Sequence, residues 1–228
     1  MTSSKYAIWD VGNEMVGHNS MPRSLWIAGV ASLGGAAIAA GIARLSTPFP
    51  LLPFLRFDAA EIFDVLSFLL FGPLGGVVTS VAHWYGLILN GGALVPGVGE
   101  TMKLIAVLST LLGLYLGIRL SRGSIWWGLV GAVASRTLVM ALVTFLLYYV
   151  LLPNVYLPFG SRALQRIGIA VQGELTLAML MTTLNGVFNL LHVFVSVVPA
   201  MGIYGAVLRA LPFMRRYVIP MPLLRRST

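Results

Sequence analysis

The amino-acid sequence predicts an all-α integral membrane protein built as a bundle of six transmembrane helices. Hydrophobic residues make up 58% of the 228 residues and charged residues only 10%, whereas a soluble domain carries about 25% charged residues. Long apolar stretches alternate with short segments that collect proline, glycine and charge. A helix needs about 20 mostly apolar residues to cross a bilayer, so the apolar stretches are candidate membrane spans.

Six apolar stretches are the predicted helices. Four of them are Leu25–Ala43, Leu104–Ile118, Trp126–Leu152 and Leu175–Leu211. Two shorter runs, Ala59–Phe71 and Pro73–Asn90, are separated by a turn that contains glycine and proline. Because Asp58, Glu61 and Asp64 mark the start of the first short run, we expect that start to lie at the membrane surface or in a water-filled pocket.

The distribution of Lys and Arg predicts the orientation, since cytoplasmic loops are enriched in both residues. With the N-terminus inside, nine of them fall on the cytoplasmic side and five on the other, with Arg136 inside the fifth span. We therefore expect a polar cytoplasmic lead (residues 1–22), a membrane domain (23–211) and a basic cytoplasmic tail (212–228), with both termini in the cytoplasm of a cell-membrane protein. The proline- or aromatic-rich segments 47–56 and 153–174 are then external loops.

Several function classes lack their sequence signatures. The net charge of +8 is spread over the ends of apolar runs rather than gathered on one face, so we expect no nucleic-acid partner. The two lysines, Lys5 and Lys103, lie in no phosphate-binding loop, and neither a His-Glu-x-x-His helix nor a Gly-x-Ser-x-Gly elbow is present. Because the chain also contains no cysteine, we predict a protein that is not an enzyme, with no catalytic residues, metal site or cofactor.

Polar residues inside two predicted helices are candidate ligand contacts. Asn185, Asn189 and His192 lie on one side of the last helix, because residues three and four apart share a helix face. Polar side chains at membrane depth usually face a cavity or a partner, although hydrogen bonding between helices is the alternative. Glu100 and Lys103 open the fourth helix; they either form an exposed pair or face the cavity, where Glu100 would accept and Lys103 would donate a ligand hydrogen bond.

Small residues recur every four positions on the first helix, including Ala28, Ser32 and Ala36. Such rows mark close contact between helices in lipid. The row either packs within the chain or docks a separate subunit.

Four stretches share their order and spacing with a known transporter family. They are residues 56–62 (RFDAAEI) with 71–76 (FGPLGG), the pair Gly99-Glu100, residues 148–156 (YYVLLPNVY), and residues 185–192 followed by Tyr204. These stretches resemble the riboflavin-specific group among the S components of energy-coupling-factor (ECF) transporters, over residues 25–210. The resemblance implies a six-helix bundle of the ECF S-component type. It also implies a vitamin pocket near the outer face, covered by the first external loop.

The resemblance further implies partners and ligand contacts. A transmembrane coupling (T) subunit and two ATPase subunits would supply the ATP chemistry, and Ala28, Ser32 and Ala36 would form the docking surface. Ligand contacts would come from the backbone of Leu52, Pro53 and Phe54 and from the side chains of Asn185, Asn189 and His192. Glu100, Lys103 and Tyr148 complete the candidate site, with Tyr148 available to stack on a flat ligand.

Riboflavin or a related flavin is the expected ligand, transported rather than held as a cofactor. The sequence departs from the riboflavin group at three positions: His192 replaces a usual Lys, Leu147 lies near a usual Asn, and Lys103 replaces another Asn. Another flat heteroaromatic vitamin or precursor is therefore the alternative ligand. The alternatives from other classes are an intramembrane enzyme that uses Glu100, Asp58 or His83, and an autonomous secondary transporter.

Overall fold

The computed structural model describes residues 21–43, 45–91, 93–121 and 123–218. Most of the predicted polar lead and the end of the predicted basic tail lie outside these residues. The predicted cytoplasmic location of both termini therefore stays a prediction.

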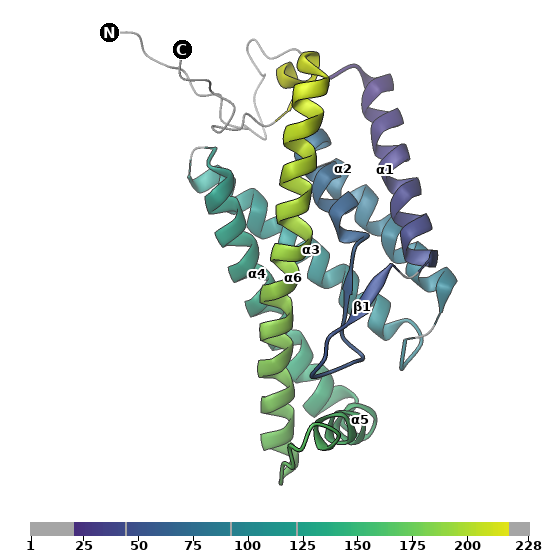
Figure 1. Cartoon of the computed structure of the whole chain (residues 1–228), viewed down its shortest axis with the longest axis vertical. Helices are drawn as coiled ribbons and strands as arrows, with labels where there is room; N and C mark the ends of the chain where they lie inside the picture. Colours follow the sequence, from purple (N-terminus) through teal and green to yellow (C-terminus); the bar gives the residue numbers. More distant parts are fainter. Residues whose placement is uncertain (1–20, 44, 92, 122, 219–228) are drawn as a thin grey trace.

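The chain folds as a bundle of long helices with a small β-hairpin beside it (Figure 1). In chain order the elements are α1 (Arg23–Ala43), β1 (Ser46–Pro48), β2 (Arg56–Asp58), α2 (Glu61–Asn90), α3 (Val98–Leu120), α4 (Ile125–Phe145), the π-helix η1 (Leu146–Leu151), α5 (Pro153–Gln165), α6 (Glu174–Ala210) and the 3-10 helix η2 (Pro212–Arg216). The predicted all-α membrane bundle is confirmed. The hairpin, in which Thr47 of β1 lies opposite Phe57 of β2, was not predicted.

The helix α2 consists of two segments that fold back on each other at Gly72. Gly72 has φ 81° and ψ −174°, a conformation that glycine adopts without the strain that a Cβ would add. Asp64 and Ser67 before the turn hydrogen-bond to His83 and Thr79 after it, so the segments lie antiparallel. With α2 counted as two segments, the described residues contain six long apolar helical segments, in agreement with the sequence prediction.

Five elements are long and apolar enough to cross a bilayer: α1, α2, α3, α4 with its extension to Leu151, and α6. Their outward faces carry large apolar side chains, such as Leu138 (71% exposed) and Leu142 (63% exposed) on α4. A broad apolar surface of this kind suits lipid rather than water. The chain is therefore a multi-pass membrane protein. The 37 residues of α6 span about 55 Å, which exceeds the ~30 Å hydrocarbon layer.

The predicted external loop over residues 153–174 contains a helix, α5. Proline fits the first position of a helix because its missing N–H would be unpaired there anyway, and Pro153 occupies that position. Tyr156, Leu157, Gly160 and Leu164 form the buried face of α5, at the three- and four-residue spacing of an amphipathic helix. The prediction of a loop was wrong for this part, because the prolines and aromatic residues that are typical of loops here belong to a short amphipathic helix.

Glycine lets neighbouring helices approach closely at two crossings. A Cβ on Gly86 of α2 would lie 2.7 Å from the carbonyl oxygen of Ile38 in α1, and a Cβ on Gly113 of α3 would overlap the carbonyl of Gly131 in α4. Membrane helices associate through such small-residue contacts because lipid provides no hydrophobic force between them. These crossings hold α1 on α2 and α3 on α4.

The row of small residues on α1 lies partly outside these contacts. Ala37 and Ala40 are buried, whereas Ala28 and Ser32 are exposed and Ala36 is half-buried. Docking of another subunit on this row stays a prediction.

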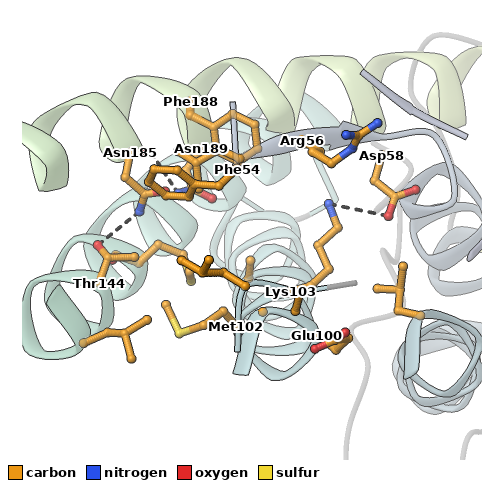
Figure 2. Close-up of a pocket in the computed structure, with 18 of the residues that line it drawn as sticks. Phe54, Arg56, Asp58, Glu100, Met102, Lys103, Thr144, Asn185, Phe188 and Asn189 are labelled. Atoms are coloured by element: carbon orange, nitrogen blue, oxygen red, sulfur yellow. Dashed lines mark hydrogen bonds and ion pairs between the residues drawn. The ribbon is translucent and has the colours of Figure 1, made fainter. Parts of the chain in front are cut away.

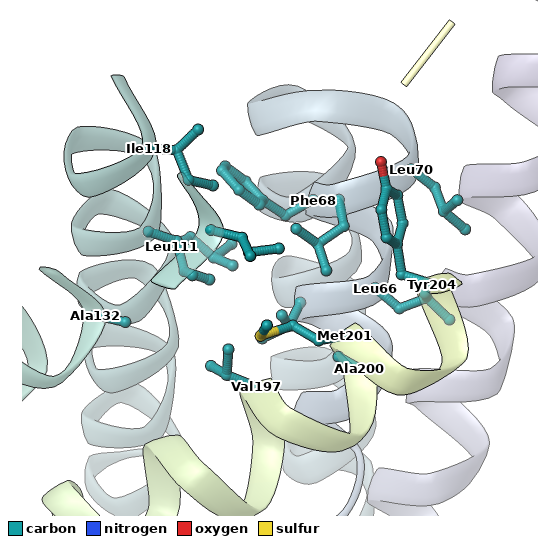
Figure 3. Close-up of a cluster of buried hydrophobic side chains, with 14 of the residues drawn as sticks. Leu66, Phe68, Leu70, Leu111, Ile118, Ala132, Val197, Ala200, Met201 and Tyr204 are labelled. Carbon is teal, nitrogen blue, oxygen red and sulfur yellow. The ribbon is translucent and has the colours of Figure 1, made fainter. Parts of the chain in front are cut away.

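Two apolar clusters occupy opposite ends of the bundle. The terminal core lies near the start of α1 and the end of α6 and includes Phe68, Leu114, Val197, Met201 and Tyr204 (Figure 3). The hairpin core lies near the β-hairpin and α5; its members include Phe49, Leu52, Tyr148, Tyr156 and Phe188. Buried charged residues lie between these two cores and form the floor of a cavity.

Candidate functional site

A cavity of about 260 Å³ opens at the hairpin end of the bundle. The hairpin, α2, α3, α4, η1, α5 and α6 all contribute to its wall. Its volume is close to the lower limit of the ~300–1,000 Å³ typical of small-molecule sites. Seven elements, from the hairpin near the start of the chain to α6 near its end, therefore meet around one ligand-sized space.

The wall of the cavity has two kinds of surface. Phe54, Phe188, Asn185 and Asn189 gather on one side in the view of Figure 2, and Arg56, Asp58, Glu100 and Lys103 lie on the other. Tyr148 and Tyr156 add two more rings to the lining. An aromatic region beside a charged one suits a ligand that has a flat ring and a polar part.

The β-hairpin covers the cavity through an aromatic contact. Phe54, at the hairpin tip, makes edge contacts with Tyr148 and Tyr156, with ring centroids 6.3 Å apart in both cases. Leu52 is fully buried in the hairpin core, whereas the neighbouring Pro53 is exposed. Aromatic pairs at such distances contribute about 0.5–1.5 kcal/mol beyond the area they bury, so the cover is held by side-chain packing.

Arg136 and Glu61 form a fully buried ion pair below the cavity. Both side chains are 1% exposed, and two hydrogen bonds join them, at 2.6 and 3.1 Å. Arg136 Nε also donates to Asn189 Oδ1 at 2.8 Å. A guanidinium is suited to this place because its planar fork matches a carboxylate and still leaves Nε for another acceptor. Arg136 thereby fixes the side-chain orientation of Asn189, which lines the cavity.

Lys103 and His83 connect Asp58 with this pair and with α2. Lys103 Nζ lies 2.7 Å from Glu61 Oε1 and 3.8 Å from Asp58 Oδ2. His83 lies between two carboxylates, with Nε2 3.1 Å from Asp58 Oδ2 and Nδ1 2.8 Å from Asp64 Oδ2. We refer to these six side chains, Asp58, Glu61, Asp64, His83, Lys103 and Arg136, as the charged layer. Charges removed from water need partners of this kind to offset the cost of desolvation.

Asp58 links the charged layer to the hairpin, since it ends β2 and lines the cavity. Burial alone would raise the pKa of its carboxyl, but Lys103, His83 and the backbone N–H of Ala60 together lower that pKa to about 2. The Asp58 side chain therefore stays ionised at neutral pH. Its backbone N–H donates to His192 Nε2 at 3.2 Å, which attaches the hairpin to α6.

The π-helix η1 brings two consecutive side chains, Leu147 and Tyr148, into the protein interior. π-Helical turns inside α-helices are frequent at functional sites, and both residues line the cavity. Burial raises the pKa of the neighbouring Tyr156 hydroxyl, and Glu100 raises it further, so this phenol remains protonated. Two residues before η1, Thr144 accepts a hydrogen bond from Asn185 Nδ2 at 3.1 Å.

The structure brings most of the predicted site residues together. Those lining the cavity are Phe54, Glu100, Lys103, Tyr148, Asn185 and Asn189, and those outside the lining are Leu52, Pro53 and His192. The imidazole of His192 is fully buried below the cavity, where Nδ1 lies 3.3 Å from Arg136 and Nε2 lies 3.4 Å from Glu61. Contact of any of these residues with a ligand stays a prediction.

Lys103 and Glu100 face the cavity rather than forming an exposed pair. Both line it, and Lys103 pairs with Glu61. No ion pair joins Lys103 to Glu100 among the described residues. The cavity-facing alternative for these two residues is therefore the one the structure adopts.

Sequence reasoning missed the role of Arg136, Glu61 and Phe188 around the cavity. Arg136 carried a usable signal, because an arginine in the middle of an apolar span is expensive and needs an internal partner. The acidic residues of the short second helix were the available partners. Their pairing depends on the turn at Gly72, and spacing along the chain does not reveal it.

The described residues contain no group of three or more His, Cys, Asp or Glu side chains placed to hold a metal ion. The charged layer is therefore a set of ion pairs and hydrogen bonds, with histidine between carboxylates rather than beside an open coordination site.

Comparison with known proteins finds similarity in structure rather than in sequence. No protein-family model and no curated protein sequence matches the chain. A solved structure of the S component of a bacterial ECF transporter is similar, with a TM-score of 0.64 and 20% sequence identity, over 83% of this chain and 99% of that one. The fold of this chain is therefore that of an ECF-transporter S component.

Proposed function

We propose that this chain is the membrane-embedded, substrate-binding S component of an ATP-driven ECF vitamin importer. The observation that carries the proposal is the cavity of about 260 Å³ covered by the hairpin, with aromatic rings and fixed amides in its wall, in a fold shared with an S component. Its role is to bind and release a small molecule, without covalent chemistry.

Riboflavin or a related flavin is the proposed ligand. The rings of Phe54, Tyr148, Tyr156 and Phe188 offer an apolar surface for a flat ring system, and Asn185 offers a side-chain amide to its polar part. Another flat heteroaromatic vitamin or precursor would use the same surfaces. Affinity in either case comes from burying a ring among apolar groups together with a few fixed polar contacts.

A T subunit and two ATPase subunits are the proposed partners, since the sequence has no phosphate-binding loop of its own. We propose that the T subunit docks on α1 through Ala28, Ser32 and Ala36. The exposure of Ala28 and Ser32 supports this proposal, because small exposed side chains let another helix approach closely in lipid. Both termini are then cytoplasmic, as the distribution of Lys and Arg predicts.

The ligand proposal is tested by purifying the chain in detergent and recording its visible absorption spectrum. A flavin band near one per chain, or saturable quenching of added riboflavin fluorescence, is the expected result. A colourless protein that fails to quench riboflavin contradicts flavin as the ligand, and a panel of other vitamins then tests the S-component assignment.

The predicted contact of His192 is tested by His192→Ala. Direct contact predicts a loss of binding of about 1–3 kcal/mol, the cost of an unpaired buried polar group. Because His192 lies below the cavity and contacts Arg136, the matched variant Asn185→Ala reports the effect of a side chain in the lining. Unchanged riboflavin affinity in His192→Ala, with reduced affinity in Asn185→Ala, removes His192 from the contact set.

A further inference from the structure

One exposed face of α5 combines apolar and basic residues. Its members are Val155, Phe159, Arg162 and Arg166, all exposed. They recur at spacings of four, three and four, so they share one side of the helix, and the buried residues of α5 are not among them. We call these four residues the basic face of α5. Aromatic and aliphatic side chains beside arginine are typical of helices that lie in the interface between membrane and water.

The helix α5 lies where the lipid-facing surface of the bundle ends. Figure 1 shows it nearly end-on beside the start of α6, so its axis runs across the bundle rather than along it. The preceding π-helix exposes Tyr149, Val150 and Leu151, and the segment after α5 exposes Ile167 and Ile169. Tyrosine is enriched at membrane interfaces because its ring is apolar and its hydroxyl is polar. Exposed apolar side chains therefore border the basic face of α5 at both ends, as at the edge of the hydrocarbon layer.

The two arginines of this face have no anionic partner in the part of the chain that the structure describes. Like charges four residues apart on a helix repel each other. The described acidic residues do not offset this charge: Glu174 is exposed but joins no ion pair among the described residues, and the others, Asp58, Glu61, Asp64 and Glu100, are buried. An anion from outside the chain would relieve the repulsion between Arg162 and Arg166.

The chemistry of the basic face of α5 favours a phospholipid as that anion. A guanidinium binds a phosphate through two parallel hydrogen bonds. Its long side chain can lie along apolar surface while its charged end stays in a polar layer. A phospholipid supplies both parts, a phosphate for the arginines and an acyl chain for Val155 and Phe159. Free phosphate would leave the apolar part of the face in contact with water.

We propose that the basic face of α5 binds an anionic phospholipid, with its phosphate between Arg162 and Arg166 and an acyl chain along Phe159. This surface is separate from the cavity and from the row of small residues on α1, and it does not depend on which ligand the cavity takes. On its buried side α5 supplies Tyr156 to the cavity wall. A lipid bound to the opposite side therefore holds in place a helix that shapes the cavity.

The experiment measures which lipid lies beside α5. The chain contains no cysteine, so Gln165→Cys, at an exposed position on α5, carries a single bimane label next to Arg162 and Arg166. The labelled full chain is reconstituted into phosphatidylcholine bilayers that contain brominated phosphatidylglycerol or brominated phosphatidylcholine, and bromine quenches the label on contact. Wild-type α5 is expected to prefer phosphatidylglycerol about fivefold or more, and Arg162→Gln/Arg166→Gln should reduce this ratio to about one.

Arg209→Gln is the matched control, because Arg209 is an exposed arginine in the last turn of α6, as Arg162 is in the last turn of α5. It should leave the preference at the label unchanged. Equal quenching by the two lipids without the arginine substitutions, or a preference that survives in a folded double variant, overturns the inference. If the double variant does not fold, the labelled protein with both arginines is measured at ~1 M salt, where the screening length is about 3 Å; a preference undiminished by salt then overturns it. None of these outcomes affects the proposed function, which riboflavin binding tests separately.

Discussion

In the terminal core, α2, α3 and α6 contact one another through apolar side chains. Nearer the cavity, the same three helices contact one another through charged and amide groups. Leu66, Leu111 and Val197 belong to the apolar part, and Glu61, Lys103 and Asn189 to the charged layer and cavity wall. Apolar packing already holds the helices together at one end. Charges buried at the other end therefore indicate a requirement of the cavity rather than of the fold.

The comparison also separates two kinds of tolerance to substitution. A close-packed apolar cluster accepts hydrophobic replacements of similar volume at a cost below about 1.5 kcal/mol. An ion pair out of water responds strongly when one partner is lost, because the other partner is left charged and buried. The predictions below test this difference, from the largest expected effect to the smallest.

Arg136→Met is expected to lower the free energy of unfolding by about 3–5 kcal/mol, since it leaves the buried Glu61 carboxylate with Lys103 and the His192 ring as its remaining partners. The double variant Arg136→Met/Glu61→Leu should recover part of that loss, because it removes the uncompensated charge as well. Unfolding followed in detergent measures both. A single variant as stable as wild type would contradict the expected cost of removing the guanidinium from this buried pair.

Leu114→Ala should lower the free energy of unfolding by about 2–5 kcal/mol through the cavity it leaves, because Leu114 is fully buried in the terminal core. Riboflavin affinity of the folded protein should stay unchanged, since the substitution is remote from the cavity wall. Leu116→Ala, at a position 42% exposed toward lipid, is the control with little expected effect. Loss of riboflavin affinity in Leu114→Ala would contradict the expectation that the terminal core contributes to stability and not to ligand binding.

Gly86→Ala should cost about 1–3 kcal/mol, the usual penalty for overpacking, because a Cβ there would lie 2.7 Å from the backbone of Ile38. Gly202→Ala in α6 is the control, as a Cβ at Gly202 meets nothing within 4 Å. Equal melting temperatures for the two variants would contradict the close approach of α1 and α2.

The pH dependence of stability should show a contribution from Asp58 only in acid. Its pKa is lowered to about 2 from an ordinary value of 3.8, so the contribution is complete above pH 3.8 and is lost as pH falls toward 2. That loss amounts to about 2 kcal/mol. Asp58→Asn should lack this component, which a comparison of unfolding at pH 5 and pH 2.5 detects; identical pH profiles for variant and wild type would oppose it.

Features that follow from a local pattern of residues could be predicted from the sequence. Hydrophobic runs such as Trp126–Leu152 predicted a span that the structure divides into α4 and η1, and the turn at Gly72 was placed correctly. The spacing of Asn185 and Asn189 also predicted that both would share a helix face, and both line the cavity.

Features that depend on contacts between distant segments could not be predicted from the sequence. His192 lies three residues after Asn189, yet it packs below the cavity because Asp58 of the hairpin and Arg136 of α4 occupy its ring nitrogens. The β-hairpin was not predicted because its strands have three residues each. Three residues are too few to show an alternation of apolar and polar side chains.

The most direct test of the account is whether the cavity is the ligand site. Ala106, buried in the cavity wall, is replaced by Phe to fill the space, and Ala134, exposed on α4, by Phe as control. Titration of riboflavin fluorescence should show one saturable site in wild type and Ala134→Phe, and none in a folded Ala106→Phe protein. Undiminished binding in Ala106→Phe would contradict the assignment of the cavity as the binding site.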